Sequence, residues 1–400
     1  MPQVRVARGA LADLAYHLNR ALLYSLMLAY VPLMLATAGG LAYAAFRLTL
    51  WVLGLSSVWR AAGFYAAVFV GMFDLAVVTA VGLLVFGLLP LFFRTVTPKP
   101  YGERLDPQRH PNLHSIVVRL CRRLRTRIPD TYLLTPFEHT GIGDLRIMDP
   151  DRGLQPKVRT LMLGAGHVVH TRADEFVTIL CHEMAHSATG DTWMSRLSYR
   201  LHASLTSQVS LQDNRFSHQR GWLRFILTLL LMGYYRLFAW LYCIDARYRE
   251  LRADRIAAEV CGPQNVRNAL IKTHLVAFLP ELSIERLWSD YCVHERDVAN
   301  LYAEHRRRWD SLPDARRGAA ENEMFMARAT TWSSHPALAD RIRNLQGVAA
   351  KELKMDHPAT SLFHHWEALE HQTTSRLIKF GRTAFAAYLD ELDRGLQVAR

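Results

Sequence analysis

The run Cys181-His182-Glu183-Met184-Ala185-His186 contains residue types that can bind and use a metal ion. On a helix, positions i and i+4 lie on one face, so His182 and His186 can each offer a ring nitrogen to one zinc ion. Glu183 then lies beside the open coordination position, where it can take a proton from a water molecule whose pKa the metal lowers to about 7. The same carboxyl group can later protonate a leaving amine. The spacing therefore predicts a zinc peptidase with Glu183 as general base and acid.

The sequence around this motif predicts the helix that the motif needs. Thr171 suits an N-cap, Asp174 and Glu175 suit the first turn, and Gly190 suits a stop. Apolar residues recur at nearly helical spacing between these positions. This context favours a metal site over a surface helix with two ordinary histidines. We expect Cys181 to be a packed core thiol rather than a ligand.

A catalytic zinc ion needs a third protein ligand. The extended form of the motif is absent, because threonines occupy the positions of its glycine and third histidine. Residues 248–260 read as a helix, with Glu250 and Asp254 spaced i, i+4 on one face. Glu250 can reach the zinc, and Asp254 can accept the second ring N–H of a ligand histidine and fix its tautomer. The alternative is a charged helix face paired with neighbouring arginines.

Together these motifs resemble the M48 family of membrane zinc metallopeptidases, which includes the bacterial heat-shock protease HtpX and the CAAX prenyl proteases. The similar stretches are H-E-x-x-H at 182–186, E-x-x-x-D at 250–254, the segment from Pro111 with Ile128-Pro129 after it, Gly190-Asp191, and Ser334-His335-Pro336 with Arg341-Ile342 and Leu345. The resemblance covers residues 111 to 346. It departs at 137–146, which lacks the family's Asn-Ala-Phe-Ala segment, so we expect a different substrate-aligning edge strand.

The resemblance implies one Zn2+ per chain and substrates that are membrane or misfolded proteins or peptides. The late element implies that His335 and Arg341 stabilise the tetrahedral oxyanion; the alternative is a buried helix-capping pair. A processing protease for one specific substrate, for example a lipidated one, is a second hypothesis. A non-catalytic zinc-containing membrane adaptor is a third, and the intact Glu183 argues against it.

The hydrophobic residues, half of the chain, are concentrated near its start. Ala21 to Phe46 has no charged residue, and Ala61 to Phe93 has only Asp74. These lengths predict a transmembrane hairpin at 21–93 rather than two core helices, and the first run is too long for a cleaved signal peptide. A basic amphipathic segment, residues 1–20, precedes the hairpin. The lipid bilayer is therefore an expected partner.

The flanking charges predict how the hairpin is oriented. Basic residues precede the first span and follow the second, while the short loop near 56–60 has only Arg60, with Arg47 near the end of the preceding span. Because positive residues stay on the cytoplasmic side, the N-terminus and the catalytic domain should both be cytoplasmic. With the family resemblance, this predicts an integral protein of a bacterial inner membrane. Five scattered cysteines fit a reducing compartment.

The net charge of +12 does not by itself indicate nucleic acid. No nucleic-acid-binding motif accompanies the basic clusters, and a domain beside anionic lipid explains them, so we expect no nucleic-acid partner. The oligomeric state is not predicted.

The patterning after the hairpin predicts an α+β fold, a mainly helical zincin-type metalloprotease domain with a small β-sheet, at 94–350. An amphipathic helix should start near Leu113, and strands are expected at Thr131–Thr135, Leu145–Met148 and Thr160–Leu163. Residues 222–244 are strongly apolar and are predicted to be membrane-associated, as a span, a re-entrant segment or an interfacial helix; the alternative is a helix buried against the hairpin. Residues 351–400 form a helical extension that packs on the domain or binds a partner.

Overall fold

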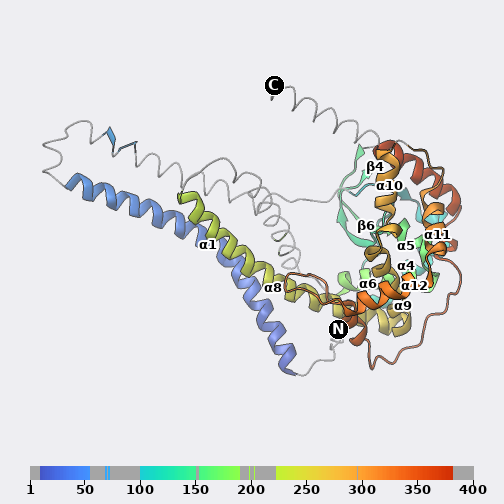
Figure 1. The fold of residues 1–400 in the computed structure, drawn as a ribbon. Helices are drawn as coiled ribbons and strands as arrows, with labels where there is room; N and C mark the ends of the chain where they lie inside the picture. Colours follow the sequence, from blue (N-terminus) through green and yellow to red (C-terminus); the bar gives the residue numbers. More distant parts are fainter. Residues whose placement is uncertain are drawn as a thin grey trace. The chain divides into compact units, whose positions relative to one another are not determined.

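The computed structural model describes residues 10–54, 100–149, 153–189, 222–294 and 296–381, with the single positions 68, 69, 71, 72, 198 and 202. These residues fall into two compact units, which are considered one at a time (Figure 1). The first, called the sheet unit, combines Thr97–Asp191 with Ala246–Arg400. The second, called the helical unit, combines Ala10–Val96 with Thr192–Asp245.

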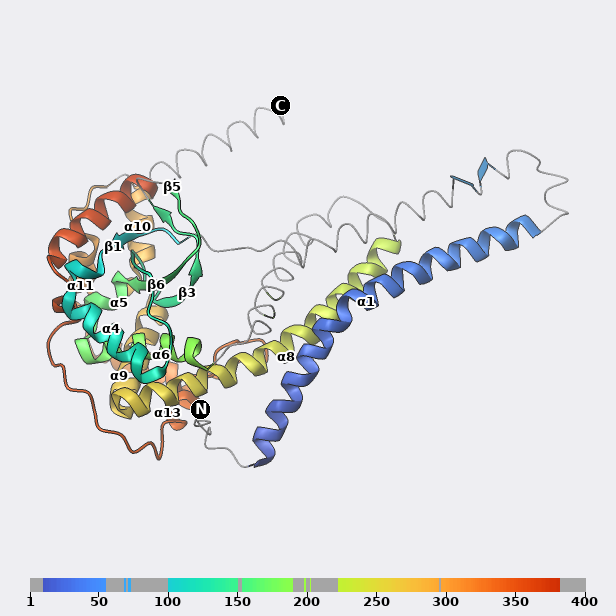
Figure 2. The same ribbon diagram turned by 180° about the vertical axis from the view of Figure 1, so that it is seen from behind.

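The sheet unit is built around a mixed four-stranded sheet of order β1-β2-β6-β3 (Figure 2). β2 runs parallel to β6, with Thr131 opposite Thr160, whereas β1 and β3 are antiparallel to their neighbours. The strands are β1 (Glu103–Leu105), β2 (Thr131–Thr135), β3 (Gly141–Leu145) and β6 (Val158–Gly164). β2 is buried along its whole length, as its apolar and β-branched sequence predicts.

Two of the three expected strands are confirmed and one is wrong. Thr131–Thr135 is β2, and Thr160–Leu163 lies within β6. In place of the strand expected at Leu145–Met148, the structure has β3 at Gly141–Leu145. Its pairing with β6 ends at Leu145, which lies opposite Val158, the first residue of β6. The following residues join a separate two-stranded ladder of β4 (Met148–Asp149) and β5 (Gly153–Leu154). The sequence of β3 did not indicate a strand because it contains two glycines, and glycine is depleted in strands.

Three helices form the layer next to the sheet: α4 (Pro111–Leu124), α5 (Ala165–His170) and α6 (Ala173–Ala188). α4 confirms the expected amphipathic helix, with Leu113, Ile116 and Val117 buried. α5 follows β6 directly and leads into α6. α6 packs against α4 and β3 and therefore lies in the middle of the unit.

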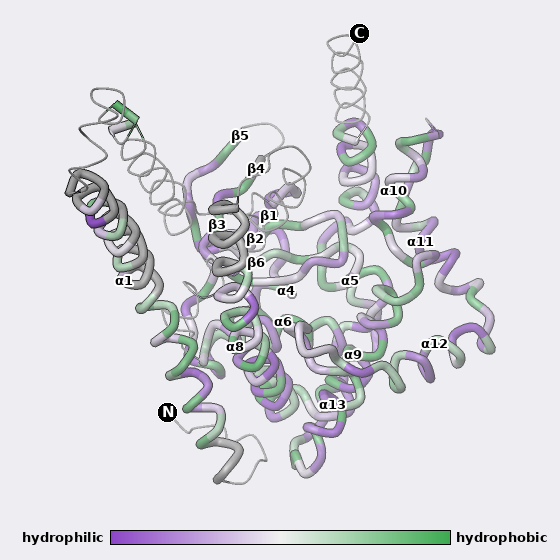
Figure 3. The backbone as a smooth tube through the Cα atoms, turned by 60° about the vertical axis from the view of Figure 1, so that its left-hand side comes forward, coloured by the Kyte–Doolittle hydropathy of each residue, from purple (hydrophilic) through white to green (hydrophobic). Residues whose placement is uncertain are grey.

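The other helices of the sheet unit follow α6 in the sequence. They are the last part of α8 (Trp222–Cys261), α9 (Pro263–Phe278), α10 (Ile284–Val293), α11 (Leu301–Ser311), α12 (Asp314–Met326) and α13 (Leu338–Arg343), with short 3-10 turns at η1 (Pro107–Arg109), η2 (Pro280–Leu282) and η3 (Ala359–Leu362). α9 packs against α6, and α12 and α13 pack against α9. Figure 3 shows hydrophilic and hydrophobic residues mixed along these helices, as expected for helices with one buried side.

The segment after residue 350 packs on the sheet unit as far as the structure describes it. Leu362, Phe363 and Trp366 are buried in the same core as the sheet. Glu352 accepts hydrogen bonds from the first backbone N–H groups of α9, at Gln264 and Asn265. Of the two alternatives from the sequence, packing on the domain therefore holds for residues 351–381.

The helical unit contains α1 (Ala10–Gly54) and the first part of α8. Hydrogen bonds join the two helices, from the Tyr16 hydroxyl to Asp245 Oδ1 (3.1 Å) and from Asn19 Nδ2 to the Leu241 carbonyl (3.1 Å). The first predicted span, 21–46, lies inside α1, whereas most of the second, 61–93, lies outside the described residues. Among the residues that the structure describes, no helix has both the length and the apolar character to cross a bilayer. The hairpin therefore stays a prediction from the sequence.

α8 joins two segments that the sequence analysis treated separately. The apolar stretch at 222–244 and the predicted helix at 248–260 are one continuous helix of 40 residues. It ends at Cys261, where Gly262 adopts a φ of 100° and Pro263 begins α9. This end confirms the stop that the Gly-Pro pair predicts.

Candidate metal centre

α6 holds the two histidines at its C-terminal end. The helix starts one residue later than expected, because Arg172 is the N-cap and its backbone N–H donates to Glu175 Oε2 (2.8 Å). Glu175 also forms an ion pair with Lys272 of α9 (2.6 Å). Phe176 and Leu180 are fully buried, which fixes the rotation of α6 and turns His182 and His186 to one side.

The structure brings His182, His186 and Glu250 together. One ligand atom from each of the three lies within 4.8 Å of the others. The Nε2 atoms of the histidines are 3.2 Å apart. Glu250 reaches from α8 to both rings, with Oε1 at 3.3 Å from His186 Nε2 and Oε2 at 3.6 Å from His182 Nε2. Cys181 is fully buried and is not part of this cluster.

These distances fit a tetrahedral zinc ion. Two nitrogens bound at about 2.0–2.1 Å with a tetrahedral angle between them lie about 3.3 Å apart. The histidine nitrogens are separated by 3.2 Å and the nearer carboxylate oxygen of Glu250 by 3.3 Å from His186, so the three atoms already have the spacing of a zinc ligand set. Two imidazoles and one carboxylate also leave a fourth position open, as catalytic zinc sites require.

Asp254 lies behind His182 rather than in the ligand set. Its Oδ1 is 3.0 Å from His182 Nδ1, and the side chain is completely buried. A carboxylate accepts only, so His182 donates from Nδ1, and its Nε2 is the nitrogen that faces the metal position. Burial raises the pKa of Asp254, but its contacts with Arg341 and His182 outweigh burial and lower it to about 2.

Arg341 of α13 donates two parallel hydrogen bonds to Asp254. Its Nε is 2.7 Å from Oδ2 and its Nη2 is 2.6 Å from Oδ1, and the residue is buried. Nη2 also lies 3.4 Å from Glu250 Oε2. The guanidinium group is therefore engaged with the two carboxylates behind the metal position.

The electrostatics of the cluster favour a cation. Burial lowers the pKa of His182, but its hydrogen bonds with Asp254 and Glu250 outweigh burial and raise it to about 10. Burial likewise raises the pKa of Glu250, yet hydrogen bonds with His182, His186 and His335 hold it well below its ordinary value. Two ionised carboxylates thus stabilise positive charge between the rings, which is the condition for binding a divalent metal.

Glu183 lies on α6 next to the ligands and faces the edge strand β3. Its Oε2 would be 3.8 Å from a side-chain carbon built on Gly141. Among the described residues, no side chain forms a hydrogen bond or a salt bridge with Glu183, although its charge helps to raise the pKa of Arg341, so its carboxylate oxygens are available for chemistry. The carbon built on Gly141 would also lie 3.1 Å from Met162 Cε, so Gly141 lies between the Met162 side chain and this carboxylate.

His335 approaches the cluster from the segment before α13. Its Nδ1 is 3.2 Å from Glu250 Oε2, while two thirds of its side chain, 67%, is exposed. It is thus the member of the cluster most open to solvent. The structure places it and Arg341 differently, although the sequence suggested one shared role for both.

Comparison with known proteins agrees with this site. The sequence model of peptidase family M48 matches residues 159–349, which include the H-E-x-x-H motif, Glu250 and Asp254. This match over residues 159–349 supports an M48 family metallopeptidase. No solved structure matches the chain.

The family match starts at Arg159, so β1, β2, β3 and α4 precede it. Sequence reasoning missed two residues near the site. One is Gly141, the β3 residue that lies next to Glu183. The other is Arg247, one turn before Glu250, which donates from Nη1 to three carbonyl groups of the turn 330–333. Only the helical spacing of Arg247, Glu250 and Asp254 could have indicated the second.

Proposed function

We propose that this chain is a membrane-anchored zinc endopeptidase that hydrolyses peptide bonds of membrane or misfolded proteins on the cytoplasmic side. The observation that carries the proposal is the spacing of His182, His186 and Glu250 next to an unpaired Glu183. A structural zinc site has four protein ligands and no use for a free carboxylate beside them.

The residues around the metal position have different roles in this proposal. His182, His186 and Glu250 would hold zinc, which when bound polarises a carbonyl group and lowers the pKa of water. Glu183 accepts a proton from the attacking water and returns it to the leaving amine. His335, the exposed member, donates toward the carbonyl oxygen as negative charge develops there. Asp254 and Arg341 keep His182 oriented.

β3 offers a place for the substrate backbone. It is the terminal strand in the sheet order that the structure describes, and it lies against α6. An extended peptide can add to such an edge through main-chain hydrogen bonds. The peptide would then run past Gly141 and Glu183, and its amide bond would face the metal position.

The membrane part of the proposal rests on the sequence. The uncharged run from Ala21 to Phe46 and the basic residues on its cytoplasmic flank support an anchor in a bacterial inner membrane, with lipid as a partner. The +12 net charge suits a domain beside anionic lipid. A processing protease for a single lipidated substrate would use the same chemistry and differ only in selectivity.

The decisive experiment compares wild type with Glu183→Gln. Glutamine has nearly the same shape and Glu183 is not a ligand, so the variant should keep its fold and about one zinc per chain. Proteolysis of denatured casein should nevertheless fall by at least about 10²-fold, the scale of lost acid–base catalysis. Metal analysis and a cleavage assay on the same preparation give both readouts. Cleavage by Glu183→Gln at the wild-type rate would refute the mechanism. A wild-type protein that binds zinc but cleaves nothing would indicate an adaptor.

A further inference from the structure

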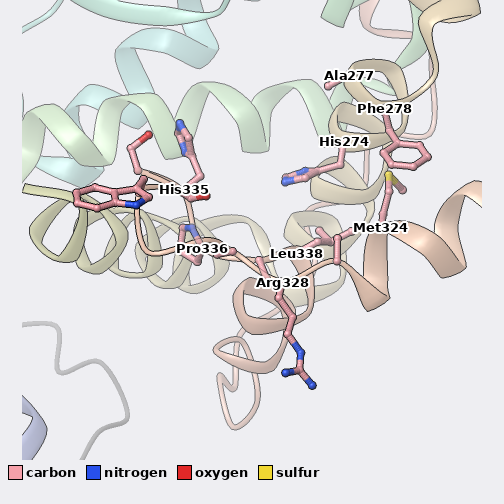
Figure 4. A pocket seen from close by; sticks show the side chains of 14 residues that line it. His274, Ala277, Phe278, Met324, Arg328, His335, Pro336 and Leu338 are labelled. Carbon is pink, nitrogen blue, oxygen red and sulfur yellow. The ribbon is translucent and has the colours of Figure 1, made fainter. Parts of the chain in front are cut away.

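A pocket of about 550 Å³ opens next to the metal centre within the sheet unit (Figure 4). Its walls come from the C-terminal turn of α9, the end of α12 and the segment 327–338. The mechanism described above does not use this space. Its volume is in the range of pockets that enclose a ligand group, and it far exceeds what an alanine or valine side chain fills.

The walls of the pocket are mainly apolar. Ala277, Phe278, Met324, Trp332 and Leu338 contribute carbon surface to it. Phe278 and Trp332 are 37% and 54% exposed, so part of each aromatic ring faces solvent in the absence of a ligand. Covering this surface with a large apolar group would be favourable by roughly 25 cal/mol for each Å² removed from water.

His274 offers a hydrogen-bond acceptor within this mainly apolar lining, which also includes Arg328, Ser333 and Ser334. His274 Nδ1 is 2.8 Å from the carbonyl oxygen of Leu270, which can only accept, so Nδ1 carries the proton. Burial lowers the pKa of His274, and the ring is therefore neutral at pH 7 with an unprotonated Nε2. In Figure 4 the ring extends from α9 toward the segment that carries His335. An aromatic group with a donor, such as a phenol or an indole, matches this lining.

The pocket and the metal centre share a residue. His335 lines the pocket and also places its Nδ1 3.2 Å from Glu250 Oε2. Through His335, the pocket therefore adjoins the place where a peptide bond would lie at the metal centre.

Arg247 holds one wall of the pocket in place. Its Nη1 donates to the carbonyl oxygens of Thr330, Thr331 and Ser333, at 3.3, 3.3 and 3.0 Å. These carbonyls surround Trp332 in the sequence, so the clamp fixes the turn that presents the indole ring. The wall is thus tied to α8, the helix that supplies Glu250.

We propose that this pocket selects the substrate residue adjoining the scissile bond, and that it takes a bulky aromatic side chain, preferring Tyr and Trp. The inference rests on the proposed function and names its substrate class. The apolar walls supply affinity for the ring, and His274 Nε2 accepts a hydrogen bond from its hydroxyl or indole N–H.

The test uses the full chain in detergent, loaded with zinc. Cleavage sites in denatured casein are mapped by mass spectrometry, and quenched peptides then vary only the enriched position among Tyr, Trp, Phe and Ala. We expect aromatic residues at one fixed position beside the cut, with kcat/KM for the Tyr peptide at least about 10-fold above that for the Ala peptide.

Three variants make the test specific. Ala277→Trp fills the pocket, so the Tyr-to-Ala ratio of kcat/KM should fall toward 1. Trp332→Ala removes an exposed wall and should lower the same ratio without disturbing the core. Ala319→Trp makes the matched change at an exposed position of α12 outside the pocket and should keep the ratio.

The outcomes separate the two proposals. Absence of zinc-dependent cleavage by wild type would overturn the proposed function, and this inference with it. Cleavage with no aromatic preference, or a preference retained in both Ala277→Trp and Trp332→Ala, would overturn the inference alone. Zinc content and circular dichroism of each variant identify any that has not folded.

Discussion

At the residue scale, the candidate centre is a chain of oriented groups. Arg341 fixes Asp254, Asp254 fixes the ring of His182, and His182 then presents Nε2 to the metal position. Each link is short and buried, so each side chain is held in one conformation. Glu183 differs in having no hydrogen-bond or salt-bridge partner among the described residues, which suits a group that must gain and lose a proton.

Substituting residues around the metal position should lower the zinc affinity by different amounts, depending on whether the residue is a ligand or orients one. Glu250→Ala removes a ligand and should abolish most zinc binding. Asp254→Ala leaves all three ligands and should weaken binding by about 10- to 100-fold, the usual result of losing a group that orients a ligand. The measurement is metal content, followed by titration with a competing chelator. Glu323→Ala, an exposed acidic residue of α12, is the control. Full zinc retention in Glu250→Ala would exclude this residue as the third ligand.

At the element scale, the junction between α8 and α9 tolerates few substitutions at Gly262. Gly262 has a φ of 100°, in the region that favours glycine, and a side-chain carbon there would lie 2.0 Å from Glu352 Oε2. Glu352 in turn accepts from the first N–H groups of α9. One glycine therefore allows α8 to end, α9 to begin and the chain near residue 352 to pack over both.

Substitution of glycine by alanine tests this junction. Gly262→Ala should lower the free energy of unfolding by more than Gly347→Ala, because both have positive φ but only Gly262 lacks space. For Gly347→Ala we expect a loss of about 1–2 kcal/mol, the cost of the left-handed conformation. Gly318→Ala, inside α12 with open space around it, should stabilise by roughly 0.5–1 kcal/mol. Denaturant titration measures all three, and equal losses at Gly262 and Gly347 would contradict the packing argument.

A second element-scale feature is the group of buried histidines between α5 and α11. The rings of His170 and His305 lie 5.6 Å apart, and His170 stacks on Trp309. Burial lowers the pKa of His167 to about 4 and that of His305 to about 4. The unfolded chain, with an ordinary histidine pKa of about 6.5, binds more protons between pH 4 and 6.5.

This difference predicts how stability depends on pH. The contribution of these histidines is fully present above about pH 6.5 and is lost progressively as the pH falls toward 4, by about 3 kcal/mol for each fully shifted ring. The free energy of unfolding of His305→Gln should therefore vary less between pH 7 and 4.5 than that of wild type. His294→Gln, at a side chain that is 62% exposed, should behave like wild type. Identical pH dependence in wild type and His305→Gln would show that His305 does not contribute.

The sequence predicted the elements with strong periodicity and missed those that depend on tertiary context. α4, α6 and β2 follow from apolar spacing, and the zinc motif indicates its own helix. β3 was shifted because its glycines carry no strand signal, yet it becomes a strand by pairing with β6. The grip of Arg341 on Asp254 joins residues 87 positions apart, so no local pattern could reveal it.

At the scale of the whole molecule, one helix takes part in two units. α8 contributes residues before Ala246 to the helical unit and the remainder, with Glu250, to the sheet unit. Within the helical unit, polar contacts from Tyr16 and Asn19 of α1 reach Asp245 and Leu241 of α8. The metal ligand thus belongs to an element that also takes part in the predicted membrane region.

Membrane topology is the prediction that belongs to this scale. Reporter fusions after Phe93 and at Arg400 should report the cytoplasm, and a fusion near Ser57 should report the opposite face. The reason is the excess of basic residues before the first predicted span and after the second. Cysteine labelling in sealed vesicles checks the same assignment independently. An Arg400 fusion on the side opposite to the N-terminus would overturn the hairpin.

The stripe of Arg247, Glu250 and Asp254 on α8 has a consequence for how this gene can vary. The three residues must keep their positions relative to one another around the helix. Arg247 holds the turn 330–333, Glu250 reaches the metal position, and Asp254 accepts from His182. Inserting one residue after Arg249 would rotate everything beyond it by about 100° relative to Arg247. The stretch between positions 247 and 254 should therefore accept many substitutions on its other faces, while any change in its length should separate the pocket wall from the metal ligand.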